Sequence, residues 1–220
     1  MRTLVVAPHP DDEVLGVGGT LMRRKAEGGS IAWLIVTNIS LETGWSHDAV
    51  LKRNNEISQI KDMFRFDKVF ELGFATTKLD LVPINELVSA VSRVLDEFTP
   101  DEIFLPHSSD IHSDHRVTFD AVTSCTKWFR SPSVKRILAY ETLSETDFGL
   151  EPSKKFHPNY FINIEGHLED KLRAMNVYSS EVQDFPFPRS NEAISALATL
   201  RGASSGFRAA EAFELLREIN

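Results

Sequence analysis

"VVAPHPDDEVLGVGGT", residues 5–20, is the stretch that decides the fold. It begins as a short apolar strand, passes through one histidine, two prolines and three consecutive acids, and ends in glycines. A strand that is apolar throughout indicates a buried strand of a parallel sheet. From Glu13 to Gly28 the apolar residues follow a helical period, and two glycines end it. The stretch therefore predicts a strand, a tight polar turn and a helix.

The rest of the chain continues this alternation of strand and helix. Further strands are expected at residues 30–37, 68–72, 101–105, 134–140 and 160–164. Further helices are expected at residues 47–64, 84–98, 115–129, 168–177, 191–200 and 209–219. This order predicts an α/β protein with a three-layer Rossmann-like fold, in which helices cover both faces of a mostly parallel sheet. Because no linker or repeat interrupts the chain, we expect a single domain over residues 1–220.

Composition excludes several classes of protein. The net charge of -8 argues against a nucleic-acid binder, which would carry a basic face. No apolar run approaches the roughly 20 residues that a membrane helix needs, so we expect no stable membrane insertion. The N-terminus shows no signal-peptide pattern, and the single Cys125 fits a reducing compartment, which together predict a cytoplasmic protein. The sequence leaves a homo-oligomer open.

The turn after the first strand has two interpretations. His9 and Asp12 are three residues apart on a tight turn, so both can aim at one point, with Asp11 close by but free. This arrangement is half of a metal site. Alternatively, one of the acids caps the following helix. A cap explains one acid but not a histidine between two prolines, and the turn alone leaves both interpretations open.

A second polar group follows the fourth predicted strand. The segment "PHSSDIHSDHR", residues 106–116, holds three of the seven histidines and two aspartates. His112 and His115 offer imidazoles at the start of a helix, with Asp114 between them. A polar loop with capping aspartates is the alternative. Because the first and fourth strands are neighbours in the usual doubly wound orders, both polar groups would share one crevice at the carboxyl edge of the sheet.

Two histidines and one carboxylate form a ligand set that leaves coordination positions open. Zinc is used in hydrolytic sites of this kind, and iron(II) is the competing metal. The free Asp11 favours hydrolysis, because it can take a proton from water whose pKa a metal lowers to about 7.

The two motifs "PHPDDE" (residues 8–13) and "HSDH" (residues 112–115), together with "RGASSGFRAAEAF" (residues 201–213), resemble the LmbE-like / PIG-L family of zinc-dependent N-deacetylases. Members remove acetyl groups from N-acetylglucosamine-type sugars, so the resemblance implies a small amino-sugar substrate. It implies that the zinc ligands are His9, Asp12 and His115. It also implies that Asp11 is the general base.

The resemblance assigns two further residues to catalysis. His112 would face the scissile carbonyl and stabilise the oxyanion. Asp114 would hold His112 in orientation and raise its pKa, so that the imidazole stays protonated.

Candidate substrate-binding residues are less sharply defined. Arg53 and Glu56 resemble an Arg-x-x-Glu pattern of the family, and an exposed helix pair is the alternative. Glu141 follows the fifth strand and is placed for the crevice, and a surface position is the alternative. Family members often carry a sugar-contacting acid soon after the third strand, whereas here Asp80 arrives late. Packing or loop structure is the favoured interpretation of three weaker candidates: Trp45, Tyr178 and Arg201.

Other functions stay open at this point. A non-catalytic sugar- or nucleotide-binding module would use the same crevice without needing an unliganded Asp11. An iron(II) oxygenase would share the ligand set. A hydrolase of another small-molecule amide would share the whole metal machinery, because specificity is set by loops that the sequence does not resolve.

Overall fold

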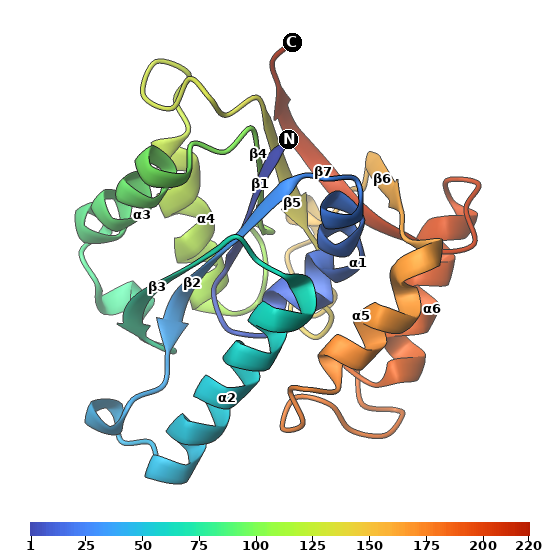
Figure 1. Cartoon of the computed structure of the whole chain (residues 1–220), viewed down its shortest axis with the longest axis horizontal. Helices are drawn as coiled ribbons and strands as arrows, with labels where there is room; N and C mark the ends of the chain where they lie inside the picture. The colour runs from blue at the N-terminus through green and yellow to red at the C-terminus, as the bar shows by residue number, and fades with distance from the viewer.

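A computed structural model of residues 1–220 contains one seven-stranded sheet, with the spatial order β3-β2-β1-β4-β5-β7-β6 (Figure 1). The strands are β1 (Arg2–Ala7), β2 (Ser30–Asn38), β3 (Lys68–Ala75), β4 (Glu102–Pro106), β5 (Arg136–Tyr140), β6 (Tyr160–Asn163) and β7 (Ala210–Glu218). Strands β1 to β5 are parallel to their neighbours among themselves, and β7 is antiparallel to both β5 and β6. The sheet is therefore mostly parallel, as predicted.

Helices lie on both faces of this sheet (Figure 1). The α-helices are α1 (Asp12–Ala26), α2 (His47–Phe64), α3 (Ile84–Phe98), α4 (Ser113–Cys125), α5 (Leu168–Met175) and α6 (Asn191–Ala203). Short 3-10 helices are η1 (Leu41–Thr43), η2 (Leu79–Leu81), η3 (Pro152–Lys154) and η4 (Glu165–His167). Buried side chains of α1, α2, α5 and α6 share one hydrophobic core, and those of α3 and α4 share another. This confirms the three-layer Rossmann-like architecture.

Strand β1 lies in the middle of the sheet and is buried on both faces. Val5 and Ala7 belong to the core beneath α1, whereas Leu4 and Val6 belong to the core beneath α3 and α4. Alternate residues of a strand point to opposite faces, so a central strand needs apolar residues at every position. This need explains the unbroken apolar run that precedes His9.

The glycines of α1 allow this helix to approach the sheet closely. A Cβ atom at Gly16 would overlap the ring of Tyr140, and one at Gly19 would lie 2.7 Å from Ile164. Neither contact is possible for a larger residue without displacement of the neighbour. Gly16 and Gly19 therefore let α1 pack closely against its neighbours.

One predicted element is wrong. Residues 209–219 are rich in alanine, glutamate and leucine, which favours a helix, but they form strand β7. Ala212 pairs with Phe161 of β6, and Phe213 pairs with both Tyr140 of β5 and Tyr160 of β6. Intrinsic helix preference amounts to less than about 1 kcal/mol per residue, and pairing on both edges of the strand overrides it.

The topology brings the two polar motifs together. β1 pairs with β4 in parallel, with Val5 opposite Phe104. The turn that begins at Pro8 and the loop that begins at His107 therefore leave the sheet side by side at its carboxyl edge. None of the helices is both long and apolar enough to span a membrane.

Candidate active site

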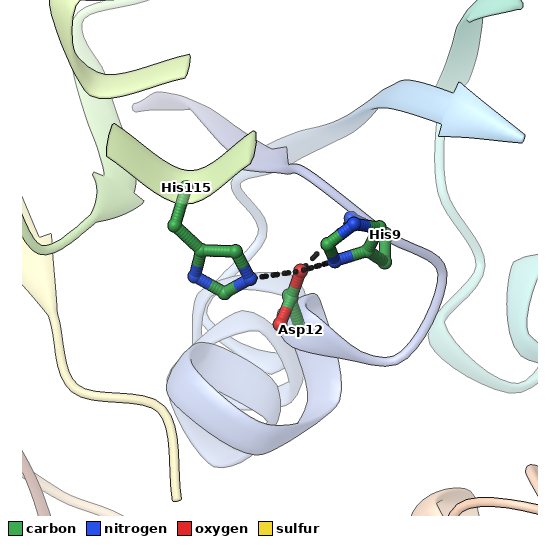
Figure 2. A group of neighbouring side chains, drawn as sticks. All are labelled: His9, Asp12 and His115. Atoms are coloured by element: carbon green, nitrogen blue, oxygen red, sulfur yellow. Dashed lines mark hydrogen bonds and ion pairs between the residues drawn. The ribbon is translucent and has the colours of Figure 1, made fainter. Parts of the chain in front are cut away.

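Three side chains from the two motifs meet at this edge (Figure 2). His9 lies in the turn after β1, Asp12 begins α1, and His115 lies in the first turn of α4. Asp12 Oδ2 is 3.4 Å from His9 Nδ1 and 3.3 Å from His115 Nε2, and the two rings point at the carboxylate from either side. One ligand atom from each residue lies within 4.8 Å of the others, so the three side chains could hold one metal ion.

Each histidine of this cluster is held by a second carboxylate. His115 Nδ1 lies 2.8 Å from Asp110 Oδ2, and His9 Nε2 lies 3.0 Å from Asp114 Oδ2. Metal-binding histidines almost always donate their second ring N–H to a carboxylate or carbonyl, which fixes the tautomer and the ring orientation. The arrangement leaves His9 Nδ1 and His115 Nε2, the two nitrogens nearest Asp12, for an ion.

The charges of the cluster also suit a cation. Burial opposes ionisation of His115, but Asp12 and Asp110 raise its pKa to about 10. Burial likewise opposes ionisation of His9, but hydrogen bonds with Asp114 and Asp12 raise its pKa to about 9. The same histidines hold the pKa of Asp12 well below its usual range, although burial acts in the opposite direction. Three carboxylates around two imidazoles therefore favour positive charge at this point, which a divalent ion supplies.

A second set of side chains has similar spacing. His9, His112 and Asp114 also place one ligand atom each within 4.8 Å of the others. However, Asp114 already accepts hydrogen bonds from the backbone N–H groups of Thr77 at 2.7 Å and Leu79 at 3.1 Å. Because these bonds occupy both of its oxygens, the set with Asp12 and His115 is the better ligand set.

Asp11 lies beside the cluster but outside it. Its backbone has φ 138°, a conformation that L-residues rarely adopt and that is found mainly where function requires it. The side chain is buried, and its Oδ2 lies 2.8 Å from Arg189 Nη1. Burial and the neighbouring charge of Asp12 raise the pKa of Asp11 to about 7, against the effect of Arg189. A carboxyl group with this pKa suits a general base at neutral pH.

Glu13, the third acid of the motif, supports the turn from below. Its Oε2 accepts the backbone N–H of Asp11 at 3.0 Å, and its Oε1 accepts the hydroxyl of Tyr178 at 2.7 Å. Both Glu13 and Tyr178 are fully buried. Tyr178 is thus a packing residue, as interpreted, and it holds the acid that fixes the strained backbone of Asp11.

His112, the other histidine of the second motif, lines a cavity that His9 and Asp11 also line. As the N-cap of α4, its Nδ1 accepts the backbone N–H of Asp114 at 3.1 Å. An imidazole whose Nδ1 accepts a hydrogen bond carries its proton on Nε2 when neutral. Burial, with added repulsion from His9, lowers the pKa of His112 to about 4. The side chain is therefore a neutral donor through Nε2–H.

This geometry corrects the expectation for Asp114. The resemblance implies that its carboxylate orients His112 and keeps that imidazole protonated. Instead, the carboxylate contacts His9 and two backbone N–H groups, and only the backbone N–H of Asp114 contacts His112. The predicted rise in the pKa of His112 is wrong, because burial outweighs the attraction of Asp114.

His9 of the cluster lines a cavity of about 240 Å³. Fourteen residues line it, only two of them hydrophobic. Asp11 and His112 are among the lining residues, and so is Arg53 from α2. Arg53 donates to the carbonyl oxygen of Pro10 at 2.8 Å, so it also fastens α2 to the motif. The cavity suits a polar substrate of modest size.

Three predicted substrate-binding residues do not line this cavity. Glu56 is buried beneath Arg53, whose Nε lies 3.4 Å from Glu56 Oε2. Asp80 is exposed in η2. Glu141 uses both carboxylate oxygens on Arg201, at 2.7 and 2.6 Å, in a bidentate pair. The three acids therefore lie outside the lining of this cavity.

Several lining residues escape sequence reasoning. Glu145, Glu181 and Arg189 come from loops after β5 and α5, and Trp45 comes from the turn before α2. The sequence favours packing or loop structure for Trp45, but this residue lines the cavity while remaining 46% exposed. For Glu181 and Arg189, a signal in the sequence is their charge at the two ends of the segment EVQDFPFPR, residues 181–189, which is rich in proline and phenylalanine.

Comparison with known proteins gives one matching family. The family model, PIG-L: GlcNAc-PI de-N-acetylase, matches residues 4–126, which include both motifs. The chain is also 24% identical over 233 residues to the diacetylchitobiose deacetylase of Thermococcus kodakarensis, an alignment that covers 99% of this chain and 84% of that protein.

Solved structures share the fold over the whole chain. The conserved protein TT1542 from Thermus thermophilus is 29% identical, with a TM-score of 0.79 that covers 99% of this chain and 96% of that one. GalB, the 4-carboxy-2-hydroxymuconate hydratase from Pseudomonas putida KT2440, is 14% identical, with a TM-score of 0.75 and coverage of 100% and 98%. The fold is thus shared by proteins with different activities. Because the family model matches more than half of the sequence, including both motifs, the chain belongs to the PIG-L family.

Proposed function

We propose that this chain is a metal-dependent hydrolase that removes the N-acetyl group from an N-acetylglucosamine-type amino sugar or its conjugate. Membership of the PIG-L family and the likeness to a diacetylchitobiose deacetylase support this reaction. The observation that carries it is the position of Asp11, which borders the same cavity as His9 but is not part of the ligand set. Amide hydrolysis needs a free base at that position, whereas a binding module or an oxygenase does not.

We assign the ion to His9, Asp12 and His115, and we propose Zn²⁺, with Fe²⁺ as the competing metal. Two nitrogens and one carboxylate oxygen, with open positions, are the donor set of catalytic zinc and of non-haem iron(II). When bound, a divalent ion would polarise the amide carbonyl and make water more acidic. Asp110 and Asp114 would keep the two imidazoles in the tautomers that face the ion.

Asp11 moves the protons of the reaction. Its carboxylate takes a proton from the attacking water, whose oxygen forms a bond to the amide carbon. The carbon–nitrogen bond then breaks, and protonated Asp11 returns the proton to the leaving amine nitrogen. The products are acetate and the free amino sugar. The rigid turn held by Glu13 and Arg189 keeps the base at the cavity throughout.

His112 stabilises the negative charge that develops on the carbonyl oxygen. Its Nδ1 is held by the backbone of α4, so its Nε2–H is the group free to donate. Because the donor is already oriented before substrate arrives, it needs little rearrangement in the transition state.

Acetate release tests this proposal. Protein loaded with Zn²⁺ or Fe²⁺ is incubated with N-acetylglucosamine, N,N'-diacetylchitobiose and charged conjugates of N-acetylglucosamine, and acetate and free amine are measured. We expect metal-dependent release from at least one sugar and loss of release in Asp11→Asn. If no N-acetylated sugar releases acetate and another small amide is cleaved, the alternative amidohydrolase function replaces this one.

Two broader features are proposed with this function. We propose that residues 1–220 form one domain, since strands from both ends of the chain share one sheet. We also propose a cytoplasmic location, because the buried Cys125 is a free thiol and the cytosol keeps thiols reduced.

A further inference from the structure

The indole ring of Trp45 forms part of the lining of the cavity next to the metal cluster. The other two tryptophans have aromatic partners, since Trp33 stacks on Phe66 and Trp128 packs against Phe129. Trp45 instead lines the cavity and is half exposed. An exposed indole beside a polar cavity offers a flat apolar face, which suits the face of a sugar ring or another flat apolar surface.

The turn that carries Trp45 is held in place on both sides. Ser40 and Thr43 form a reciprocal capping box, and Gly44 follows with φ 92°, in the left-handed region that favours glycine. The backbone N–H of Trp45 then donates to the carbonyl oxygen of Ser40 at 3.2 Å. Immediately afterwards, Ser46 caps α2 by accepting from Ala49 N–H at 3.2 Å. The indole is therefore presented by an ordered turn.

Both arginines that line the cavity are already paired with carboxylates. Arg53 Nη2 lies 2.7 Å from Glu181 Oε1. Arg189 lies 2.8 Å from Asp11, 3.2 Å from Glu145 and 3.5 Å from Glu181.

These are the only two arginines that line the cavity, and no lysine lines it. Three carboxylates of the cavity thus face two guanidinium groups, so neither arginine is free to pair with an anionic ligand. A phosphate or carboxylate on the substrate would have to displace Glu181 and would meet the charge of Glu145.

We propose that the site selects a neutral saccharide, with a second sugar ring seated against Trp45, and discriminates against substrates whose aglycone is a phosphate or a carboxylate. This inference rests on the proposed function and narrows its substrate class. The reacting N-acetyl group lies at the metal cluster, and the neighbouring ring extends along the cavity toward the indole. Because Arg53 and Arg189 are paired with carboxylates of the cavity, the site favours a neutral aglycone over a charged one.

The first experiment compares three substrates by acetate release from the zinc-loaded protein. These are N-acetylglucosamine, the neutral disaccharide N,N'-diacetylchitobiose, and N-acetylglucosamine 1-phosphate. We expect kcat/KM for the disaccharide to exceed that for the phosphate at least tenfold. Absence of acetate from these three and from the other N-acetylated sugars of the panel above overturns the proposed deacetylase function itself. Acetate release with the phosphate as the better substrate overturns only the inference about a neutral partner.

The second experiment tests the indole and the charge pairing separately. Trp45→Ala should lower the ratio of kcat/KM for the disaccharide over the monosaccharide about tenfold, chiefly through KM, and Trp45→Phe should restore most of it. Trp128→Ala, which removes an exposed tryptophan outside the cavity, is the matched control and should leave the ratio unchanged.

Glu181→Gln removes the carboxylate that lies nearest Arg53 and also contacts Arg189, and it should raise the relative kcat/KM for the phosphate several-fold. Equal ratios in Trp45→Ala and Trp128→Ala, or no change with Glu181→Gln, would contradict the inference.

Discussion

Two groups of charged side chains in this molecule differ in how far the surrounding residues balance their charges. In the first, His9, Asp12 and His115 lie together at the carboxyl edge of the sheet, and His9 lines the cavity. In the second, Lys171 of α5 pairs with Glu211 of β7 at 2.6 Å, away from that cavity. Apart from His9, whose side chain is 21% exposed, the residues of both groups are almost fully buried, so burial of charge alone does not mark a functional site.

The two groups differ in whether their charges and hydrogen-bonding groups are already balanced by protein partners. Glu211 also accepts the backbone N–H groups of Gly19 at 2.9 Å and Thr20 at 2.7 Å, and Lys171 also donates to the carbonyl oxygen of Leu15 at 2.8 Å. Every charge of that pair is matched, and the pair joins α1, α5 and β7. The metal cluster instead holds a surplus of carboxylates around two histidines, which is a favourable setting for a cation. The paired arrangement serves stability and the metal cluster serves chemistry.

Removal of a ligand should have the largest effect. We expect His115→Ala to lose the bound metal and all detectable deacetylation, because two of three protein ligands cannot hold the ion against water. Elemental analysis of the purified protein measures the occupancy. His47→Ala, which removes an exposed histidine of α2, is the control and should retain metal. Full metal occupancy in His115→Ala would remove His115 from the ligand set.

Removal of the base should leave the metal and reduce turnover. Asp11→Asn keeps the size of the side chain but cannot take a proton from water. We expect kcat to fall by about 10²- to 10⁴-fold, the usual contribution of a general base. Metal content should equal that of the wild type. A variant that turns over as fast as the wild type would show that another group is the base.

Removal of the buried Lys171–Glu211 ion pair should lower the stability of the fold rather than the catalytic rate. Lys171→Met leaves the buried Glu211 without its counter-charge, which typically costs about 3–5 kcal/mol of the free energy of unfolding. Lys25→Met removes the same kind of side chain from an exposed pair with Asp67 and should cost at most about 1 kcal/mol. Urea unfolding measures both. Equal losses in the two variants would mean that the buried pair is no more important than the exposed one.

Removal of His112 should have a smaller effect on turnover than removal of the base. Loss of one oriented donor to an oxyanion typically lowers kcat by about 10²- to 10³-fold. We therefore expect His112→Ala to keep its metal and to lose activity in this range, measured as acetate release at saturating substrate. A loss of less than tenfold would exclude His112 as the oxyanion donor.

Sequence reasoning recovers the parts of this molecule that short-range patterns encode. The first six strands follow from apolar runs, and the meeting of His9 with His115 follows from the parallel pairing of β1 with β4. Strand β7 escapes it because the residues of this strand favour a helix locally, and only pairing with β5 and β6 makes them a strand. Such pairing depends on residues about fifty or more positions away, which no local pattern contains.

The residues that contact the ligands and the base also cannot be predicted from local sequence patterns. The ligand spacing in the two motifs is visible in the sequence, but the partner of each side chain is not. The sequence pairs Asp114 with His112, its neighbour in the chain, whereas the carboxylate contacts His9, which lies 105 residues away. Arg189 reaches Asp11 across 178 residues. Loops converge on the cavity only once the sheet has formed, so their contacts cannot be read from the sequence alone.

The smallest expected effect concerns the exposed ion pair between Lys25 and Asp67, whose contribution to stability should depend on pH. Lys25 contacts both oxygens of Asp67, at 2.9 and 2.8 Å, and Ile31 N–H donates to Oδ2 at 2.8 Å. Burial acts to raise the pKa of Asp67, but these hydrogen bonds outweigh it and lower the pKa below 3.8. A carboxyl group whose pKa is lower in the folded than in the unfolded state stabilises the fold above the unfolded value, and this contribution is lost as pH falls through the folded value.

Asp67→Asn should therefore be less stable than the wild type at pH 7, by at most about 1 kcal/mol for the exposed pair. The difference should narrow below pH 3.8, where the wild-type carboxylate takes up its proton. Urea unfolding of both proteins at about pH 7 and about pH 3, on either side of the unfolded pKa, measures the change. A difference that stays constant between these two pH values would mean that Asp67 acts through packing rather than through its charge, and the exposed pair would then differ from the buried Lys171–Glu211 pair in kind as well as in size.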